Sequence, residues 1–150
     1  MDIARFLDMG TDLENRISRI YEKISSLTND ESLSKRLISL SREELNHANI
    51  LRTGKNYLSE MPDLFLGVQL GDEEIQEGLE DAGALLSELD IGLSFPEGLK
   101  RILQLEKRFE QIHLGISVEI GEPSLKKLFQ ALTKGDQNHV RILSEIIAAF

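Results

Sequence analysis

The feature that most constrains this chain is an apolar helical stripe in which a carboxylate and a histidine stand where the pattern calls for leucine. From Leu33 to Leu58 the stripe residues recur at alternating steps of four and three, which is the spacing of one inward-facing side of an α-helix. Glu44 and His47 lie within that stripe. The pattern therefore predicts a helical protein that buries ionisable side chains among apolar ones.

The same motif occurs a second time near the other end of the chain. Asp136 and His139 repeat the spacing, and they also lie in an apolar stripe. Residues three apart share one face of a helix, so each pair presents an oxygen and a nitrogen on the same side, as metal ligands do. One such pair often arises by chance in a charged helix, but a repeated pair is a much stronger indication of a metal site.

Both motifs belong to a longer internal repeat. A shift of 92 residues aligns His47 with His139 and Glu14 with Glu106, without a gap. A register shared over this length is typical of a duplicated helical hairpin. The repeat therefore adds Glu14 and Glu106 to the candidate ligands.

Hairpin geometry brings the candidate carboxylates to one level. Glu14 and Glu44 are equally far along the chain from a predicted turn at Asn29, so they face each other across an antiparallel pair of helices. The second hairpin has the same symmetry about Gly121. All four carboxylates can therefore converge if the two hairpins pack together.

The length of the chain favours a single domain with a long central connection. We expect hairpin 1 over about residues 2–58, an acidic crossover over about 59–95, and hairpin 2 over about 96–149. The crossover has no lysine or arginine between Ser59 and Pro96, and it contains a short helix that begins near Asp72. The apolar stripe of that helix either packs on the bundle or forms a contact in a homodimer.

Composition excludes several classes of protein. The 150 residues include no cysteine, which excludes disulfides, thiolate metal sites and a cysteine nucleophile. The formal net charge is -9 and there is no basic stripe, so we expect no nucleic-acid partner. No stretch approaches the about 20 apolar residues of a membrane span, and the first residues do not resemble a signal peptide. We therefore expect a cytoplasmic protein with no membrane partner.

Charge balance favours a pair of metal ions. Four buried carboxylates without a lysine or arginine beside them would carry an uncompensated charge in a low-dielectric interior. Two divalent ions would balance them, and a mixture of imidazole and carboxylate suits iron or manganese better than calcium, with zinc a further possibility. The alternative is a polar stripe whose members satisfy one another. The predicted ligands are Glu14, Glu44, His47, Glu106, Asp136 and His139.

Three further residues lie close to this set in the sequence. Tyr21 follows Glu14 by seven positions and His113 follows Glu106 by the same interval, so each is near the ligand face of its helix. Tyr21 either hydrogen-bonds a ligand or is an ordinary buried tyrosine. His113 is a further ligand, a hydrogen-bond donor to a ligand or a core histidine, and the last two roles together are favoured. Glu43 is expected on a solvated face.

A Glu on each of two helices and a carboxylate-x-x-His on each of the other two resembles the di-iron or di-manganese signature of the ferritin-like superfamily. Glu14 followed by Tyr21 is most similar to the rubrerythrin branch. The resemblance covers both hairpins and implies a ferritin-like four-helix bundle with two iron ions. The implied roles are one terminal ligand per metal from Glu14 and Glu106, bridges from Glu44 and Asp136, and one nitrogen each from His47 and His139.

The chain departs from that family in three respects. Asp136 stands where the family usually has Glu, and its shorter side chain could lengthen the metal separation or weaken the binding of one metal. Phe109 stands where rubrerythrins carry a further Glu. Full rubrerythrins also have a four-cysteine rubredoxin domain that delivers electrons, so turnover by this chain would need an external electron donor.

Three functions are compatible with these residues. We favour a non-haem di-iron, or di-manganese, oxidoreductase of peroxidase or ferroxidase type, whose metals react with peroxide or dioxygen. The first alternative is a module that binds, handles or senses metal ions without turnover. The second alternative is a metal-free helical interaction module with a decayed site.

Overall fold

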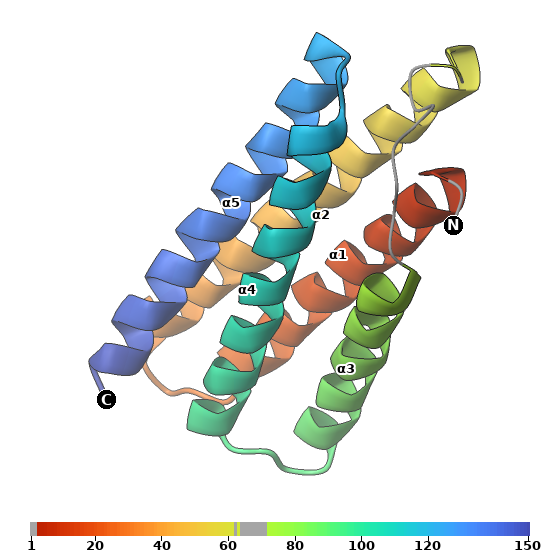
Figure 1. Cartoon of the computed structure of the whole chain (residues 1–150). Helices are drawn as coiled ribbons and strands as arrows, with labels where there is room; N and C mark the ends of the chain where they lie inside the picture. The colour runs from red at the N-terminus through yellow and green to blue at the C-terminus, as the bar shows by residue number, and fades with distance from the viewer. Residues whose placement is uncertain (1–2, 62, 64–71) are drawn as a thin grey trace.

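The computed structural model describes residues 3–61, 63 and 72–150, and this part of the chain is mostly helical (Figure 1). The five helices are α1 (Ile3–Ser25), α2 (Glu31–Glu60), α3 (Asp72–Asp90), α4 (Phe95–Glu119) and α5 (Pro123–Ala148). The predicted all-α class is confirmed. The part of the predicted acidic crossover at residues 62 and 64–71 lies outside the described residues.

Two helices begin at capping residues, Asp30 for α2 and Ser94 for α4. The Asp30 side chain accepts a hydrogen bond from Leu33 N at 3.1 Å, and Ser94 accepts one from Glu97 N at 3.4 Å. Each satisfies an amide that has no partner within the first turn of its helix. The chain leaves α3 through Gly92, whose φ of 110° is readily adopted only by glycine. Local chemistry therefore places the breaks between helices.

Two antiparallel hairpins, α1 with α2 and α4 with α5, form most of the fold (Figure 1). They contact each other through α2 with α5 and through α1 with α4. α3 runs back from the far end of α2 toward the turn of the first hairpin, so that α4 starts beside the end of α1. There a Cβ on Gly98 would lie 3.3 Å from Ile24 Cγ1, which shows how closely these helices approach.

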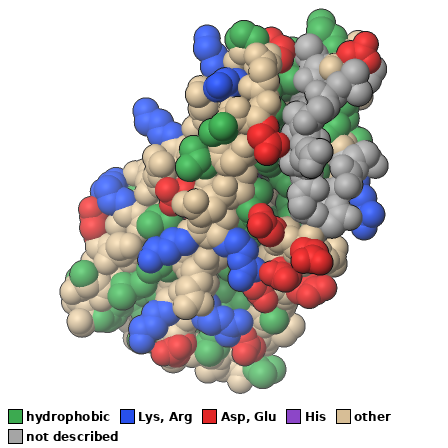
Figure 2. Space-filling view, in the orientation of Figure 1, with side chains coloured by type: hydrophobic (Ala, Val, Ile, Leu, Met, Phe, Trp, Pro, Cys, Tyr) green, Lys and Arg blue, Asp and Glu red, His purple; other side chains and the backbone are tan. Residues whose placement is uncertain are grey.

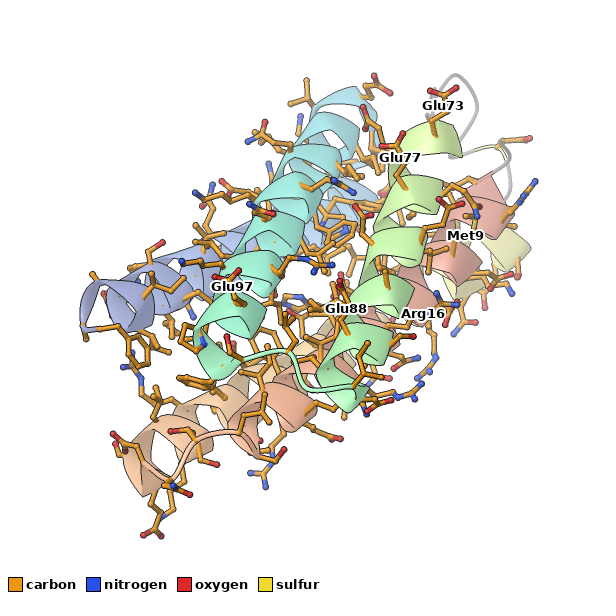
Figure 3. All side chains as sticks on the ribbon, turned by 90° about the horizontal axis from the view of Figure 1, so that it is seen from below. Met9, Arg16, Glu73, Glu77, Glu88 and Glu97 are labelled. Carbon is orange, nitrogen blue, oxygen red and sulfur yellow. The ribbon has the colours of Figure 1, made fainter. Side chains whose placement is uncertain are left out.

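α3 packs against α1 and α4. Its buried apolar side chains are those of Ile75, Leu79, Ala82, Leu85 and Leu89. Arg16 of α1 lies beside α3 in Figure 3 and donates a hydrogen bond to the Leu79 carbonyl at 3.0 Å. A Cβ on Gly78 would lie only 2.7 Å from Phe109 Cζ, so glycine permits the close approach of α3 to α4. Of the two roles predicted for this stripe, packing on the bundle is the one observed.

The acidic residues of α3 lie toward the surface, next to basic residues of neighbouring helices (Figure 2). Arg101 and Arg108 of α4 form ion pairs with Glu88 and Asp81 at 2.5 and 2.6 Å. These pairs are partly exposed, so each contributes little to stability. Their effect is to compensate part of the negative charge of α3 where it meets α4.

All five helices contribute to one buried apolar cluster. Within the described ranges, no helix is long and apolar enough to cross a membrane. The cluster is interrupted where α1, α2, α4 and α5 meet, because several ionisable side chains are buried there. These side chains form the candidate site.

Candidate metal centre

Four helices bring the six predicted ligands into one buried region. Their exposed fractions lie between 0% and 6%. α1 supplies Glu14, α2 supplies Glu44 and His47, α4 supplies Glu106, and α5 supplies Asp136 and His139. Each occupies a position that the helical periodicity turns inward. Each of the four carboxylates forms ion pairs with one or two of the buried histidines.

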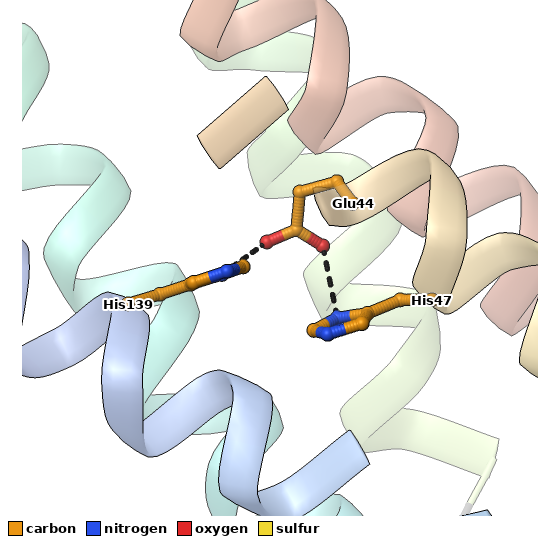
Figure 4. A group of neighbouring side chains, drawn as sticks. All are labelled: Glu44, His47 and His139. Carbon is orange, nitrogen blue, oxygen red and sulfur yellow. Dashed lines mark hydrogen bonds and ion pairs between the residues drawn. The ribbon is translucent and has the colours of Figure 1, made fainter. Parts of the chain in front are cut away.

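Glu44 connects two histidines (Figure 4). Its Oε1 lies 2.7 Å from His139 Nδ1, and its Oε2 lies 3.4 Å from His47 Nδ1. The two imidazole rings are stacked, with centroids 5.2 Å apart and planes 15° from parallel. These three side chains form a first group that could hold a metal ion, with one carboxylate oxygen directed to each ring.

A second group that could hold a metal ion consists of Glu14, His113 and Asp136. His113 Nδ1 lies 2.6 Å from Asp136 Oδ2, and its Nε2 lies 3.9 Å from Glu14 Oε1. The three side chains are all buried. Of the roles predicted for His113, a hydrogen bond to a predicted ligand is observed, and the same position also makes it the nitrogen donor of a group that could hold a metal ion.

Glu106 contacts the first group through His139. Its Oε1 lies 3.2 Å from His139 Nδ1 and accepts a hydrogen bond from the Tyr21 hydroxyl at 2.8 Å. Tyr21 is fully buried, and this bond joins α1 to α4. Of the two roles predicted for Tyr21, a hydrogen bond to a predicted ligand is the one observed.

Glu43 is a site contact that sequence reasoning missed. Its Oε2 accepts a hydrogen bond from His139 Nε2 at 2.6 Å, although 44% of the Glu43 side chain is exposed. A carboxylate that binds the far nitrogen of a metal-ligating histidine orients the ring and raises its basicity. The predicted solvated face is observed in part, but helix packing also brings the Glu43 carboxylate within hydrogen-bond distance of His139. The one feature of the sequence that could have indicated this contact is the position of Glu43 directly before the predicted ligand Glu44.

Three buried polar atoms in this region have no hydrogen-bond partner: Glu44 Oε2, His47 Nδ1 and Asp136 Oδ1. They lie near one another, because His47 Nδ1 is 3.4 Å from the Glu44 oxygen and 3.9 Å from the Asp136 oxygen. A buried polar atom without a partner costs about 1–3 kcal/mol. Two carboxylate oxygens and an imidazole nitrogen suit iron, manganese or zinc, so the residues present fit a bound metal ion.

Burial changes the ionisation of the carboxyl groups. Desolvation, together with repulsion from Glu106, raises the pKa of Glu44 from 4.5 to about 8. Desolvation and the neighbouring Glu44 also raise the pKa of Glu14. Without a metal, the region therefore retains protons on carboxyl groups that would be ionised in water.

His139 and Glu106 behave as a buried ion pair. Desolvation lowers the pKa of His139, but its hydrogen bonds to Glu106 and Glu44 outweigh this and raise it from 6.5 to about 12. Desolvation raises the pKa of Glu106, but the hydrogen bond and charge of His139, together with hydrogen bonds to Glu44 and Tyr21, outweigh it and lower that pKa to about 2. Ligand groups release such protons when a metal binds, so a divalent ion would replace them as the source of positive charge.

Comparisons with protein-family models, with curated proteins and with solved structures find no match. The interpretation of the site therefore depends on the geometry of this chain. That geometry provides two buried groups of histidine, glutamate and aspartate that could hold metal ions.

Proposed function

We propose that the chain is a ferritin-like, non-haem protein of rubrerythrin type that holds two metal ions, with iron favoured, between its hairpins. The observation that carries this proposal is the convergence of Glu44 Oε2, His47 Nδ1 and Asp136 Oδ1, three buried atoms that have no hydrogen-bond partner. These atoms come from α2 and α5, in different hairpins. Without a metal each is left with an uncompensated desolvation cost.

The two observed groups support part of the ligand assignment that the family pattern implies, and they differ from it in three ways. His47 and His139 lie in one group, His113 lies in the other, and Glu106 lies in neither. Glu44 directs one oxygen toward each histidine, so Glu44, His47 and His139 together would hold one ion. Asp136 directs one oxygen to His113 and the other toward His47. His113, with Glu14 and Asp136, would supply a nitrogen to the second ion that the family pattern does not include. We therefore include His113 among the proposed ligands.

The chain would position the ions and exclude water from them. Bound ferrous ions would supply the electrons that reduce peroxide or dioxygen. Tyr21 orients Glu106 through its hydroxyl, and Glu43 orients His139. Since this chain has no cysteine, re-reduction would depend on an electron donor outside it.

Anaerobic iron titration followed by oxidation tests the proposal. Both groups should fill, giving two ferrous ions per chain, and peroxide should then convert them to a coupled ferric pair detectable by optical and Mössbauer spectroscopy. Glu44→Ala and His139→Ala should lose this signal, whereas Glu22→Ala, at an exposed position of α1, should keep it. A protein that retains no metal, or that never forms the coupled pair, would refute the proposed function.

A second candidate function is metal binding or sensing without turnover. The three buried histidines favour it, because a nitrogen-containing site also suits zinc, which has no redox chemistry. Peroxide consumption separates the two functions. If the iron-loaded protein retains both ions but does not consume peroxide, metal binding without turnover is supported instead.

A further inference from the structure

The two histidines of the repeated motif have different surroundings. The shift of 92 residues that aligns His47 with His139 also aligns Glu43 with Gly135. Glu43 binds the far nitrogen of His139 at 2.6 Å. The equivalent position opposite His47 has no side chain. The duplicated site is therefore asymmetric, with one ring held by a carboxylate and the other facing a glycine.

Gly135 allows His47 to approach the backbone of α5. A Cβ at this position would lie 2.3 Å from His47 Nε2 and 2.6 Å from His47 Cε1, so any side chain here would force the imidazole ring or the backbone to shift. Glycine inside a helix costs about 1 kcal/mol relative to alanine. The close approach of the imidazole ring gives a physical reason for a glycine here.

A surface groove of about 370 Å³ opens over the same place, between α2 and α5. Its lining includes His47 and Gly135, together with Asn46, Asn138 and Lys134. Of the six predicted ligands, His47 is the one that lines this groove, and it has the largest exposed fraction, 6%. His47 is thus where the buried carboxylates meet the surface.

We infer that this groove is the port through which a divalent metal ion enters, and that His47 is the first ligand it meets. The inference rests on the proposed function. The amide oxygen of Asn46 and the imidazole of His47 are suitable temporary ligands for a partly hydrated ion, whereas the Asn138 oxygen accepts a hydrogen bond from Arg141 at 2.7 Å. The carboxylates beneath attract a cation inward, whereas Lys134 opposes its approach.

Stopped-flow uptake of cobalt(II) by the metal-free protein, followed by its visible absorption, tests the port. Ala131 and Lys134 line the groove at exposed positions of α5, so both can be changed without altering a proposed ligand. Ala131→Trp should cover the groove and slow uptake several-fold. Lys134→Glu should raise the rate about tenfold at low ionic strength, with the gain lost in high salt. Ser144→Trp, also exposed on α5 but outside the groove, is the matched control and should leave the rate unchanged.

Equilibrium binding distinguishes failure of the port from failure of the site. If all three variants bind cobalt to the same stoichiometry as the parent and at the same rate, the ion enters elsewhere and the inference is wrong. If the parent binds no cobalt at equilibrium, the metal site itself is refuted, and the port with it. Slowing by Ala131→Trp and acceleration by Lys134→Glu, at unchanged stoichiometry, support the port.

Discussion

Glu43, on the partly exposed side of α2, accepts a hydrogen bond from the fully buried His139 of α5 at 2.6 Å. The bond occupies Nε2 of the ring, so that Nδ1 is directed to Glu44 and Glu106. Glu43 therefore links the surface to the buried groups and determines which nitrogen of His139 faces the other candidate ligands.

Glu43→Ala should weaken metal binding without removing a ligand. Loss of a carboxylate that orients a ligating histidine typically costs about 10–100-fold in metal affinity. Competition against a chelator of known affinity would measure the effect. Glu22→Ala, at an exposed position of α1, is the control and should retain the parent affinity. Equal affinities of the two variants would show that Glu43 does not support the site.

His113→Ala should reduce the metal content of the protein from two ions to one. The substitution removes the nitrogen donor of the group formed with Glu14 and Asp136, and it leaves the Glu44 group intact. Metal analysis after equilibrium dialysis would give the stoichiometry. Retention of both ions by the variant would mean that His113 is a core histidine and not a ligand.

The metal-free protein should lose stability as pH rises from about 4.5 toward 12. A group whose pKa is raised on folding stabilises the folded state below its unfolded pKa, and this contribution disappears as pH rises through its folded pKa. The pKa of Glu44 is raised from 4.5 to about 8, so its contribution to stability is lost in the lower part of that range. The pKa of His139 is raised from 6.5 to about 12, so its contribution is lost in the upper part. The raised pKa values of Glu14, His47 and His113 act in the same direction.

Urea unfolding in the presence of a chelator, at a series of pH values, would measure this dependence. Below pH 4.5 stability should instead fall as pH falls. The pKa of Glu106 is lowered to about 2 on folding, so its contribution to stability is lost as the carboxylate becomes protonated. Glu44→Gln should reduce the slope between pH 4.5 and about 8. A free energy of unfolding that increases from pH 5 to pH 8 would contradict the prediction.

Gly78→Ala should destabilise the protein even though alanine is the better helix former. The added Cβ would lie 2.7 Å from Phe109 Cζ, and overpacking of this kind costs about 1–3 kcal/mol. Gly83→Ala in the same helix is the matched control, since its Cβ would meet Arg16 at an ordinary 3.6 Å. That variant should gain up to about 1 kcal/mol from helix propensity. Thermal or urea unfolding of both variants would measure the two changes in stability. Equal changes would show that the packing of α3 on α4 does not require a glycine at position 78.

Much of the fold could be predicted because it follows from local rules. Apolar residues at steps of three and four determine the buried face of each helix, and the caps at Asp30 and Ser94 determine where helices begin. The same periodicity turns Glu44 and Asp136 inward, and both are buried. Periodicity therefore located the candidate ligands at the level of the individual helix.

The pairing of these residues was decided only by the tertiary structure. Glu44 and His139 are 95 residues apart in sequence and meet at 2.7 Å, and His113 reaches Asp136 from another helix. The sequence by itself determined which side of each helix is buried, since that depends on neighbours one turn away. Which nitrogen meets which oxygen depends on the rotation and translation of one hairpin relative to the other. The contact of Glu43 with His139 depends on this packing, so the sequence pattern did not predict it.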